Sequence, residues 1–247
     1  MPPEDGVLPG HTSMRTPPST RSHTMPATRM PATRMPADDP ILSALDAVGE
    51  AAEFPRRHVI FTEGEPGDRL YLIRSGKVKL SRALSGGREH LLALLGPAEM
   101  FGEISLYAAA PRESTATAVT QVHVLGIDRS FLLQWIAHRP DIAEHLLGAL
   151  ARGLRRSTSM LTEAVTNDVR GRLAWALLDL TARFGSQHGG LLRVTHDLTQ
   201  LELAQLVGAS RETVNKALAE FTDRGLLRVE GRTVVILDPE RLARRAR

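Results

Sequence analysis

The chain has 247 residues, enough for one large or two modest domains that each bury a core. Apolar residues make up 42% and charged residues 24% of it, the mix of a soluble globular protein. The absence of cysteine excludes disulfides, thiolate zinc sites and a cysteine nucleophile. No apolar stretch approaches the ~20 residues of a membrane helix, and no secretory signal opens the chain. We therefore predict a cytoplasmic protein without a membrane partner.

The charge balance is nearly even, with a formal net charge of +3 from 31 basic and 28 acidic side chains. All of the basic residues except Lys77, Lys79 and Lys216 are arginines. Arginine favours planar, bidentate contact with phosphate, carboxylate or guanine. The composition therefore permits a nucleic-acid partner. Whether the protein has one has to be judged from the positions of the arginines in the chain.

Residues 1–40 differ in composition from the rest of the chain. A pentapeptide at residues 25–29 is repeated at residues 30–34. Proline at every fifth position blocks both helix and strand pairing, and there is little apolar surface to bury. We predict a disordered leader over residues 1–40, which either binds a partner or is a functionless extension.

Residues 41–140 contain short β-prone runs separated by glycine-rich breaks. Strands at this spacing, with turn residues between them, predict a small barrel or sandwich. Helices do not alternate with the strands, so a Rossmann-type parallel sheet is disfavoured. The runs are 58–61, 70–74, 78–83, 91–95, 115–120 and 122–127.

Residues 141–167 change to a helical period. Apolar residues three and four apart predict a seam on one long helix, which is typical of a dimer. A helix packed on its own barrel is the alternative. Ser157 interrupts the seam, and a hydroxyl there needs a polar partner, for which a ligand is a candidate. The seam positions are Leu147, Leu150, Leu154, Ser157, Leu161 and Ala164.

Residues 168–247 form a second predicted domain, with a helix over 173–184 and a loop over 185–190. Thr199 and Glu202 make the S/T-x-x-E pattern of a capping box, which opens a helix. Gly208 ends that helix, and Ser210 can cap a second one. Two short helices joined by a tight glycine turn are typical of a DNA-binding helix-turn-helix.

The start of the second helix is predicted to enter the major groove of DNA. Arginine can pair with guanine, and glutamate can accept a hydrogen bond from cytosine, so Arg211 and Glu212 can read neighbouring bases. The hydroxyls of Thr199, Ser210 and Thr213 are placed for phosphates. Further candidates for DNA contact are Asn215 and Lys216, one turn on, and Gly231 and Arg232, in a predicted hairpin that would serve as a wing.

This order of glycine-punctuated barrel, seam helix and winged helix-turn-helix resembles the Crp/Fnr superfamily of transcription regulators, most closely its cAMP receptor protein branch. The resemblance covers residues 54–247. It rests on segment 207–214 of the second helix, on segments 63–71 and 75–78 of the barrel, and on 101–104 followed by Pro111 and Arg112. It implies an α+β fold: an N-terminal cyclic-nucleotide-binding β-roll (jelly-roll-like barrel), a long dimerisation helix and a C-terminal winged helix-turn-helix.

The resemblance also implies function. It implies a homodimer on an inverted-repeat DNA site, with Arg211, Glu212 and Lys216 on bases, and RNA polymerase as a partner. It implies an effector pocket for cAMP, in which Glu103 holds the ribose and Arg112 the phosphate. The other predicted pocket residues are Gly102, Ile104, Glu113 and Ser114, with Ser157 and Thr158 on the base across the dimer.

Two departures from the family pattern weaken the predicted cAMP pocket. Glu113 stands where relatives usually have Ser or Thr, and Gly153 where they often have an arginine. At ~4 Å and an effective dielectric constant of about 20, each unit charge is worth up to ~4 kcal/mol before screening. If Glu113 swings outward, Ser114 could supply the hydroxyl. Both cAMP and another small effector therefore stay open.

The leading hypothesis is a DNA-binding transcription regulator controlled by a small effector. The alternative is a cyclic-nucleotide sensor that regulates a partner protein or enzyme by contact. Neither a G-x-S-x-G elbow nor a phosphate-binding G-x-x-x-x-G-K-[ST] loop is present, so we expect no enzyme and no catalytic residues. His138 and His145 lack a third ligand nearby in sequence, so we expect no metal.

Overall fold

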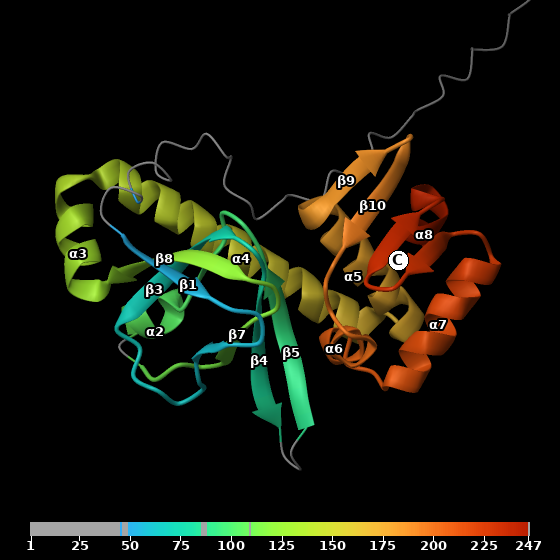
Figure 1. Ribbon diagram of the computed structural model, residues 1–247, viewed down its shortest axis with the longest axis horizontal. Helices are drawn as coiled ribbons and strands as arrows, with labels where there is room; N and C mark the ends of the chain where they lie inside the picture. Colours follow the sequence, from blue (N-terminus) through green and yellow to red (C-terminus); the bar gives the residue numbers. More distant parts are fainter. Residues whose placement is uncertain (1–44, 46–48, 85–87, 109, 247) are drawn as a thin grey trace, which may run out of the picture.

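The computed structural model describes residues 45, 49–84, 88–108 and 110–246. The predicted leader, residues 1–40, lies outside this part of the chain. The described residues form a β-rich half and a second, mixed half, and one long helix runs behind both (Figure 1). We call the described residues between 49 and 128 the β-roll and residues 168–246 the winged domain.

The β-roll consists of two four-stranded antiparallel sheets that do not close into a barrel. Six strands fall on the runs expected from the sequence. Strands β1 and β6 do not, because β1 exposes two glutamates and β6 has only two residues. The first sheet has the order β1 (Glu50–Phe54), β8 (Val122–Asp128), β3 (Arg69–Ser75), β6 (Met100–Phe101); the second has β2 (Val59–Phe61), β7 (Thr115–Ala118), β4 (Val78–Leu84), β5 (Arg88–Leu95).

An apolar core between the strands holds the β-roll together. The rings of Phe61 and Phe101 each stack on Tyr71, and the ring centre of Phe101 lies 5.8 Å from that of Phe61 and 5.1 Å from that of Tyr71. Val78 and Val124 are buried in the same cluster. After β6 the chain turns through Gly102, whose φ is +82°, into the short helix α2 (Glu103–Ala108). This helix was not predicted from the sequence.

The long helix α4 (Pro140–Thr166) follows α3 (Arg129–His138) and has two different faces. Proline at its first turn is favoured because no backbone N–H is needed there. Ile142 and Leu146 are buried in a cluster with the β-roll. On the predicted seam, Leu147, Leu154 and Leu161 are 65%, 71% and 67% exposed. The first turns of α4 therefore pack on the β-roll, whereas these three leucines of the predicted seam do not.

The winged domain begins with α5 (Val169–Phe184), which Asp168 caps by accepting a hydrogen bond from the Gly171 N–H at 2.8 Å. The prediction of a loop over residues 185–190 is wrong for residues 185–188, which form a strand. Residues of β9 (Gly185–His188) pair with β10 (Leu191–Thr195) through a turn at Gly189 and Gly190. All four residues of β9 are exposed. Its sequence is polar and lacks the alternation of apolar and polar residues that predicts a strand.

Three further helices and a hairpin complete the winged domain. Its sheet has the order β11-β12-β10-β9, and the predicted wing hairpin is present as β11 and β12. The elements are α6 (Gln200–Leu206), α7 (Arg211–Asp223), β11 (Leu227–Glu230), β12 (Thr233–Ile236) and α8 (Pro239–Arg245).

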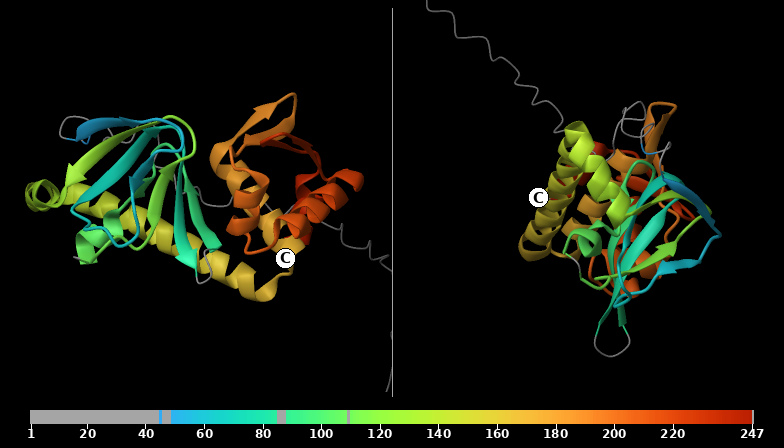
Figure 2. Two further views of the ribbon diagram at one scale, coloured as in Figure 1. Left: turned by 60° about the horizontal axis from the view of Figure 1, so that its bottom comes forward. Right: turned by 90° about the vertical axis from the view of Figure 1, so that its left-hand side faces the viewer.

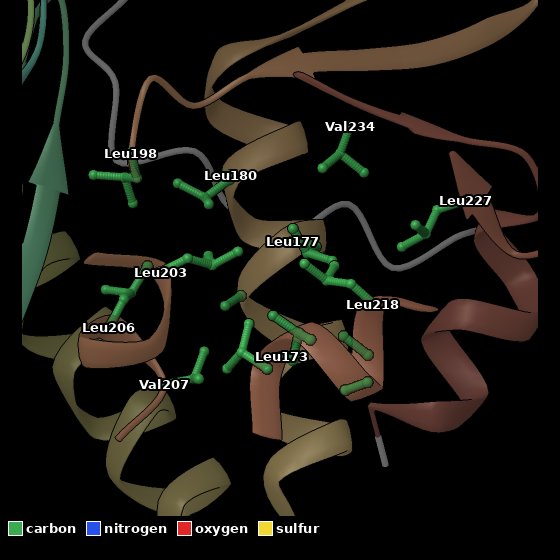
Figure 3. Packing of buried hydrophobic residues seen from close by; sticks show 14 of the residues in the cluster. Leu173, Leu177, Leu180, Leu198, Leu203, Leu206, Val207, Leu218, Leu227 and Val234 are labelled. Atoms are coloured by element: carbon green, nitrogen blue, oxygen red, sulfur yellow. The ribbon is translucent and has the colours of Figure 1, made fainter. Parts of the chain in front are cut away.

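The core of the winged domain extends into the β-roll. Leu173, Leu177 and Leu203 pack together at its centre (Figure 3). Leu91 and Leu94 of β5 belong to the same buried cluster. The two halves therefore lie against each other as well as along α4, as the turned views show (Figure 2).

Candidate nucleic-acid interface and effector site

Helix α7 is placed by a tight turn and a cap. Gly208 adopts φ +64°, a conformation that favours glycine, between α6 and α7. Ser210 is the N-cap of α7, and its Oγ accepts a hydrogen bond from the Thr213 N–H at 3.1 Å. The Ser210 and Thr213 hydroxyls are also 2.8 Å apart. This confirms the capped second helix expected from the sequence.

The first turns of α7 present polar side chains to solvent. Val214, on the opposite face, is buried in the core. Glu212 and Lys216 form an ion pair of 2.8 Å while both side chains stay more than 70% exposed. No ion pair or hydrogen bond holds the Arg211 side chain among the described residues. The polar face consists of Arg211, Glu212, Thr213, Asn215 and Lys216, all exposed.

Helix α6 starts at the predicted capping box. The Thr199 Oγ1 accepts from the Glu202 N–H at 3.2 Å, and the Thr199 N–H donates to the Glu202 carboxylate at 2.8 Å. Arg172 then fixes the end of the helix. Its Nε and Nη2 donate to the carbonyls of Val207 and Gly208 at 2.9 Å and 3.3 Å. Arg172 was not among the predicted residues, because one arginine on a helix gives no local signal of so distant a contact.

The wing turns at Gly231, where φ is +65°. Arg232, beside it, is half-buried, and its carbonyl accepts from the His196 N–H at 3.1 Å. Glu230 is bound by Arg228 at 2.8 Å and by Arg193 at 3.1 Å. The wing is thus tied to the strand beside it. A recognition helix and a wing of this kind can contact a DNA groove and its flanking phosphates.

The candidate effector site in the β-roll centres on Arg112, which is only 4% exposed. Its Nη1 and Nη2 donate to the carbonyls of Gly102 and Arg69 at 2.8 Å and 2.7 Å. The guanidinium lies 4.2 Å from the ring centre of Phe61. Its buried Nε has no partner among the described residues. A Cβ on Gly102 would come within 2.6 Å of Nη1, so the close approach requires glycine.

Two carboxylates lie near this arginine. Burial raises the pKa of Glu103, against the opposing charge of Arg112, and the negative charge of Glu113 raises it further. Glu113 itself is exposed, whereas Ser114 is half-buried. Ile104 is 49% exposed. The site therefore combines a buried cation with a half-buried carboxyl group, and Glu113 stands at its solvent side.

The predicted effector residues on α4 lie outside this cluster. The Thr158 hydroxyl donates to the carbonyl of Leu154 at 3.0 Å, within its own helix. Ser157 lies at the edge of a separate cavity between α4 and the winged domain. A Cβ at Gly153 would meet nothing within 4 Å. Within the described chain, no hydrogen bond links Ser157 or Thr158 to Glu103 or Arg112. Their predicted contact, across a dimer, stays a prediction.

Ion pairs join the β-roll to the winged domain, and none of them was predicted from the sequence. Lys77 lies 2.6 Å from Asp197. Lys79 of β4 lies 3.0 Å from Glu202, the capping-box residue of α6. Lys77 and Asp197 are 120 positions apart, and residues so distant carry no mutual signal in a single sequence.

A third interdomain pair is deeply buried. Arg183 of α5 lies 2.6 Å from Glu99, with side chains 2% and 4% exposed. Gly96 is pressed against Phe184, since a Cβ there would come within 2.4 Å of the ring. The two halves are thus joined by charge and by close packing.

Metal and membrane features can be assessed for the described residues. They contain no group of three or more His, Asp or Glu side chains that could hold a metal ion. None of their helices combines the length and the apolar character needed to span a bilayer.

The β-roll, the long helix and the winged helix-turn-helix together define a transcription regulator with a DNA-binding domain and a cyclic-nucleotide-binding domain. The family profile described as "Cyclic nucleotide-binding domain" matches residues 51–139, and that described as "Crp-like helix-turn-helix domain" matches residues 171–245. The chain belongs to the Crp/Fnr family of transcription regulators.

Individual relatives agree with this assignment. The chain is 57% identical over 206 residues to the "CRP-like cAMP-activated global transcriptional regulator" of Mycobacterium tuberculosis, covering 83% of this chain and 92% of that protein. It is 40% identical over 183 residues to the "Cyclic AMP receptor protein" of Thermus thermophilus, covering 74% and 82%. A solved CRP/FNR-family transcriptional regulator from Thermus thermophilus matches with a TM-score of 0.67 and 28% identity, covering 80% and 98%.

Proposed function

We propose that the protein acts as a homodimer that binds an inverted-repeat DNA site through α7 and is controlled by a small effector. The observation that carries the proposal is the start of α7, where Arg211, Glu212 and Lys216 are exposed on a capped helix. Arg211 would pair with guanine and Glu212 would accept from cytosine. Asn215 is a candidate for adenine, and Thr199, Ser210, Thr213, Gly231 and Arg232 are candidates for phosphate contacts.

Dimerisation is supported by the unpartnered face of α4. A row of leucines more than 60% exposed on one helix is costly in water and typical of an interface. A parallel pair of such helices would place two copies of α7 about one turn of DNA apart, which matches an inverted repeat. RNA polymerase is the expected further partner. We expect the protein to act in the cytoplasm by binding, without catalysis.

For the effector we propose cAMP in the β-roll. The M. tuberculosis relative is described as cAMP-activated. Arg112 would hold the phosphate, because its buried Nε is still unpartnered among the described residues. Glu103 would hold the ribose hydroxyl, and Gly102, Ile104 and Ser114 would line the site. When bound, the nucleotide supplies one negative charge, which the Arg112 guanidinium balances.

Glu113 reduces the expected affinity but does not close the site. Its side chain is exposed, so water screens its charge and the side chain can turn outward. Gly153 leaves open space where relatives often carry an arginine. We therefore expect cAMP to bind more tightly to Glu113→Ser than to the unchanged protein.

Two measurements test the proposal. Fluorescence anisotropy with a TGTGA-type inverted repeat, as the family resemblance suggests, should give binding that weakens steeply with salt as counterions are released. Calorimetric titration with cAMP should give heat for the unchanged protein and a lower Kd for Glu113→Ser. A flat salt response would favour regulation by protein contact instead. Heat for neither protein would remove cAMP from the proposal and leave the DNA result standing.

A further inference from the structure

A half-open cavity of about 620 Å³ lies between the long helix and the winged domain, away from Arg112 and from the exposed face of α7. Its walls come from β5, α4, α5 and the turn between α6 and α7. Its size is that of a small-molecule site, which typically has a volume of roughly 300–1,000 Å³. Neither Arg112 and Glu103 nor the exposed face of α7 lines it, whereas Ser157, Leu161 and Ala164 of the predicted seam stand at its rim.

Most of the lining is apolar. Leu206 and Val207 are buried at the turn, and Trp175 is half-buried on α5. Exposed side chains of α4 form the rim. An apolar ligand body would be removed from water against these side chains, and the polar lining residues include Glu163 and Asp179 as well as Arg156. The apolar lining residues are Leu92, Met160, Leu161, Ala164, Trp175, Ala176, Leu206 and Val207.

Arg156 supplies a cation to this cavity. Its side chain is 13% exposed, and Nη2 donates to Asp179 at 3.0 Å. Its Nε is buried without a partner among the described residues. Asp179 is shared, since Arg183 also donates to it at 3.2 Å. An arginine has five N–H donors, so Arg156 retains the capacity to bind an acidic group.

The second arginine of the lining is already used. Arg172 donates through Nε, Nη1 and Nη2 to the carbonyls of Val207, Asn167 and Gly208. Arg156 is therefore the cation that a ligand would meet, because its described bonds involve Nη2 alone.

We propose that this cavity binds an amphipathic carboxylic acid, with the apolar body against Trp175 and Met160 and the carboxylate on Arg156. The floor of the cavity, Val207 and Gly208, precedes the Ser210 cap of α7. A ligand that favours one position of this turn would shift the population of DNA-competent molecules. Neither Arg112 nor Glu103 lines this cavity, so the two ligands would bind to different residues.

The test uses the full chain and decanoate as the probe. The protein has two tryptophans, and Trp135 packs in the β-roll cluster with α3 and α4. In Trp135→Phe, the remaining Trp175 reports the cavity. Decanoate below its micelle concentration should change the Trp175 emission saturably. Arg156→Met should weaken decanoate binding by about tenfold or more, because a charged hydrogen bond is lost, and should leave decanol binding unchanged.

Matched controls separate binding in this cavity from binding elsewhere on the protein. Arg152→Met, one turn earlier on α4 and outside the lining, should bind decanoate as the parent does. Arg156→Lys keeps the charge if Arg156→Met fails to fold. Ala164→Phe, on the exposed rim, should block entry in either case without adding a second tryptophan.

Four outcomes would overturn the proposal. The first is no saturable change of Trp175 emission. The second is an equal affinity of decanoate for the parent and a folded Arg156→Met. The third is binding only at protein concentrations where the protein is monomeric, which would mean that the partner's α4 fills the cavity in the dimer. Displacement of decanoate by millimolar cAMP would also contradict the assigned ligand class. A negative result here leaves the anisotropy and calorimetry tests of the proposed function unaffected.

Discussion

Lys79 on β4 and Glu202 on α6 form an ion pair of 3.0 Å that joins the β-roll to the first helix of the helix-turn-helix. The same carboxylate closes the capping box with Thr199. Burial alone would raise the pKa of Glu202, but hydrogen bonds from Thr199 and Lys79 outweigh it and lower that pKa. A change in β4 therefore acts directly on the start of α6.

Lys79→Met should destabilise the protein by about 1–2 kcal/mol, because a partly buried charged hydrogen bond is lost. It should also weaken the contact between the β-roll and α6, because the ion pair with Glu202 is lost. Urea unfolding measures the first effect and DNA affinity the second. Lys77→Met removes the neighbouring pair with Asp197 and leaves the capping box intact, so it is the matched control. In a double-mutant cycle, the effects of Lys79→Met and Glu202→Gln on the free energy of unfolding should not be additive. Additive effects would mean that the two side chains have no interaction energy.

Arg211→Ala should cost about 1–3 kcal/mol of DNA-binding free energy and relax base choice at one position of each half-site. Anisotropy titrations against single-base variants of the repeat measure both effects. Arg224→Ala removes the same charge at the far end of α7, where Arg224 pairs with Glu220 at 2.9 Å. An equal loss on all sequences would identify Arg211 as a phosphate contact instead.

The buried pair of Arg183 and Glu99 gives a stability prediction. Glu99→Ala should destabilise the protein by about 3–5 kcal/mol, because it leaves a buried guanidinium short of its partner. The double variant Glu99→Leu with Arg183→Met should recover much of that loss, since both charges are then removed. Denaturant unfolding of the parent and the two variants gives the free energies of unfolding that test this prediction. A double variant as unstable as Glu99→Ala would show that packing around Arg183, rather than its charge, is responsible.

His196 gives a pH prediction. Its side chain is buried, and burial lowers its pKa from 6.5 to about 4, with smaller effects of Asp197, Lys77 and Glu202. Its Nδ1 accepts from the Leu198 N–H at 3.1 Å, which requires that nitrogen to be unprotonated. Between pH 6.5 and 4 the unfolded chain binds the proton more readily than the folded one. The contribution of His196 is therefore complete above pH 6.5 and is lost as the pH falls toward 4.

The shift corresponds to roughly 3 kcal/mol at most. The unfolding free energy, measured in urea between about pH 4 and 7, should fall more steeply for the parent than for His196→Asn, which can still accept from the Leu198 N–H. Parallel pH profiles for the two proteins would contradict a neutral, buried His196.

Leu154→Glu should convert the dimer to monomers in sedimentation velocity, because it places a charge on the exposed seam of α4. Ser159→Glu adds the same charge to the same helix away from the seam positions and should leave the dimer intact. A dimer that survives Leu154→Glu would place the interface elsewhere.

Local chemistry made much of the winged domain predictable. The capping box at Thr199, the cap at Ser210 and the wing turn at Gly231 each lie within a few residues of the groups they satisfy. Helix α2 and strand β9 were not expected, because α2 is too short to show a period and β9 is polar throughout.

The candidate site was predictable to different degrees. Residues of the α7 face are close in sequence, and the helical period brings them together. The environment of Arg112 was not predictable, because its partners are backbone carbonyls, which any residue supplies. Arg172 holds the turn at Val207 from 35 positions away, and such contacts depend on the complete fold.

The shared core has a consequence for how this protein can be divided. Leu91, Leu94 and Val119 of the β-roll side are shielded in one cluster with the leucines of α5 and α6. Cutting the chain after α4 would expose these three side chains on an open sheet, a surface prone to self-association. The two halves should therefore melt together in a single transition, and neither could be exchanged with that of a distant relative without redesigning this shared boundary.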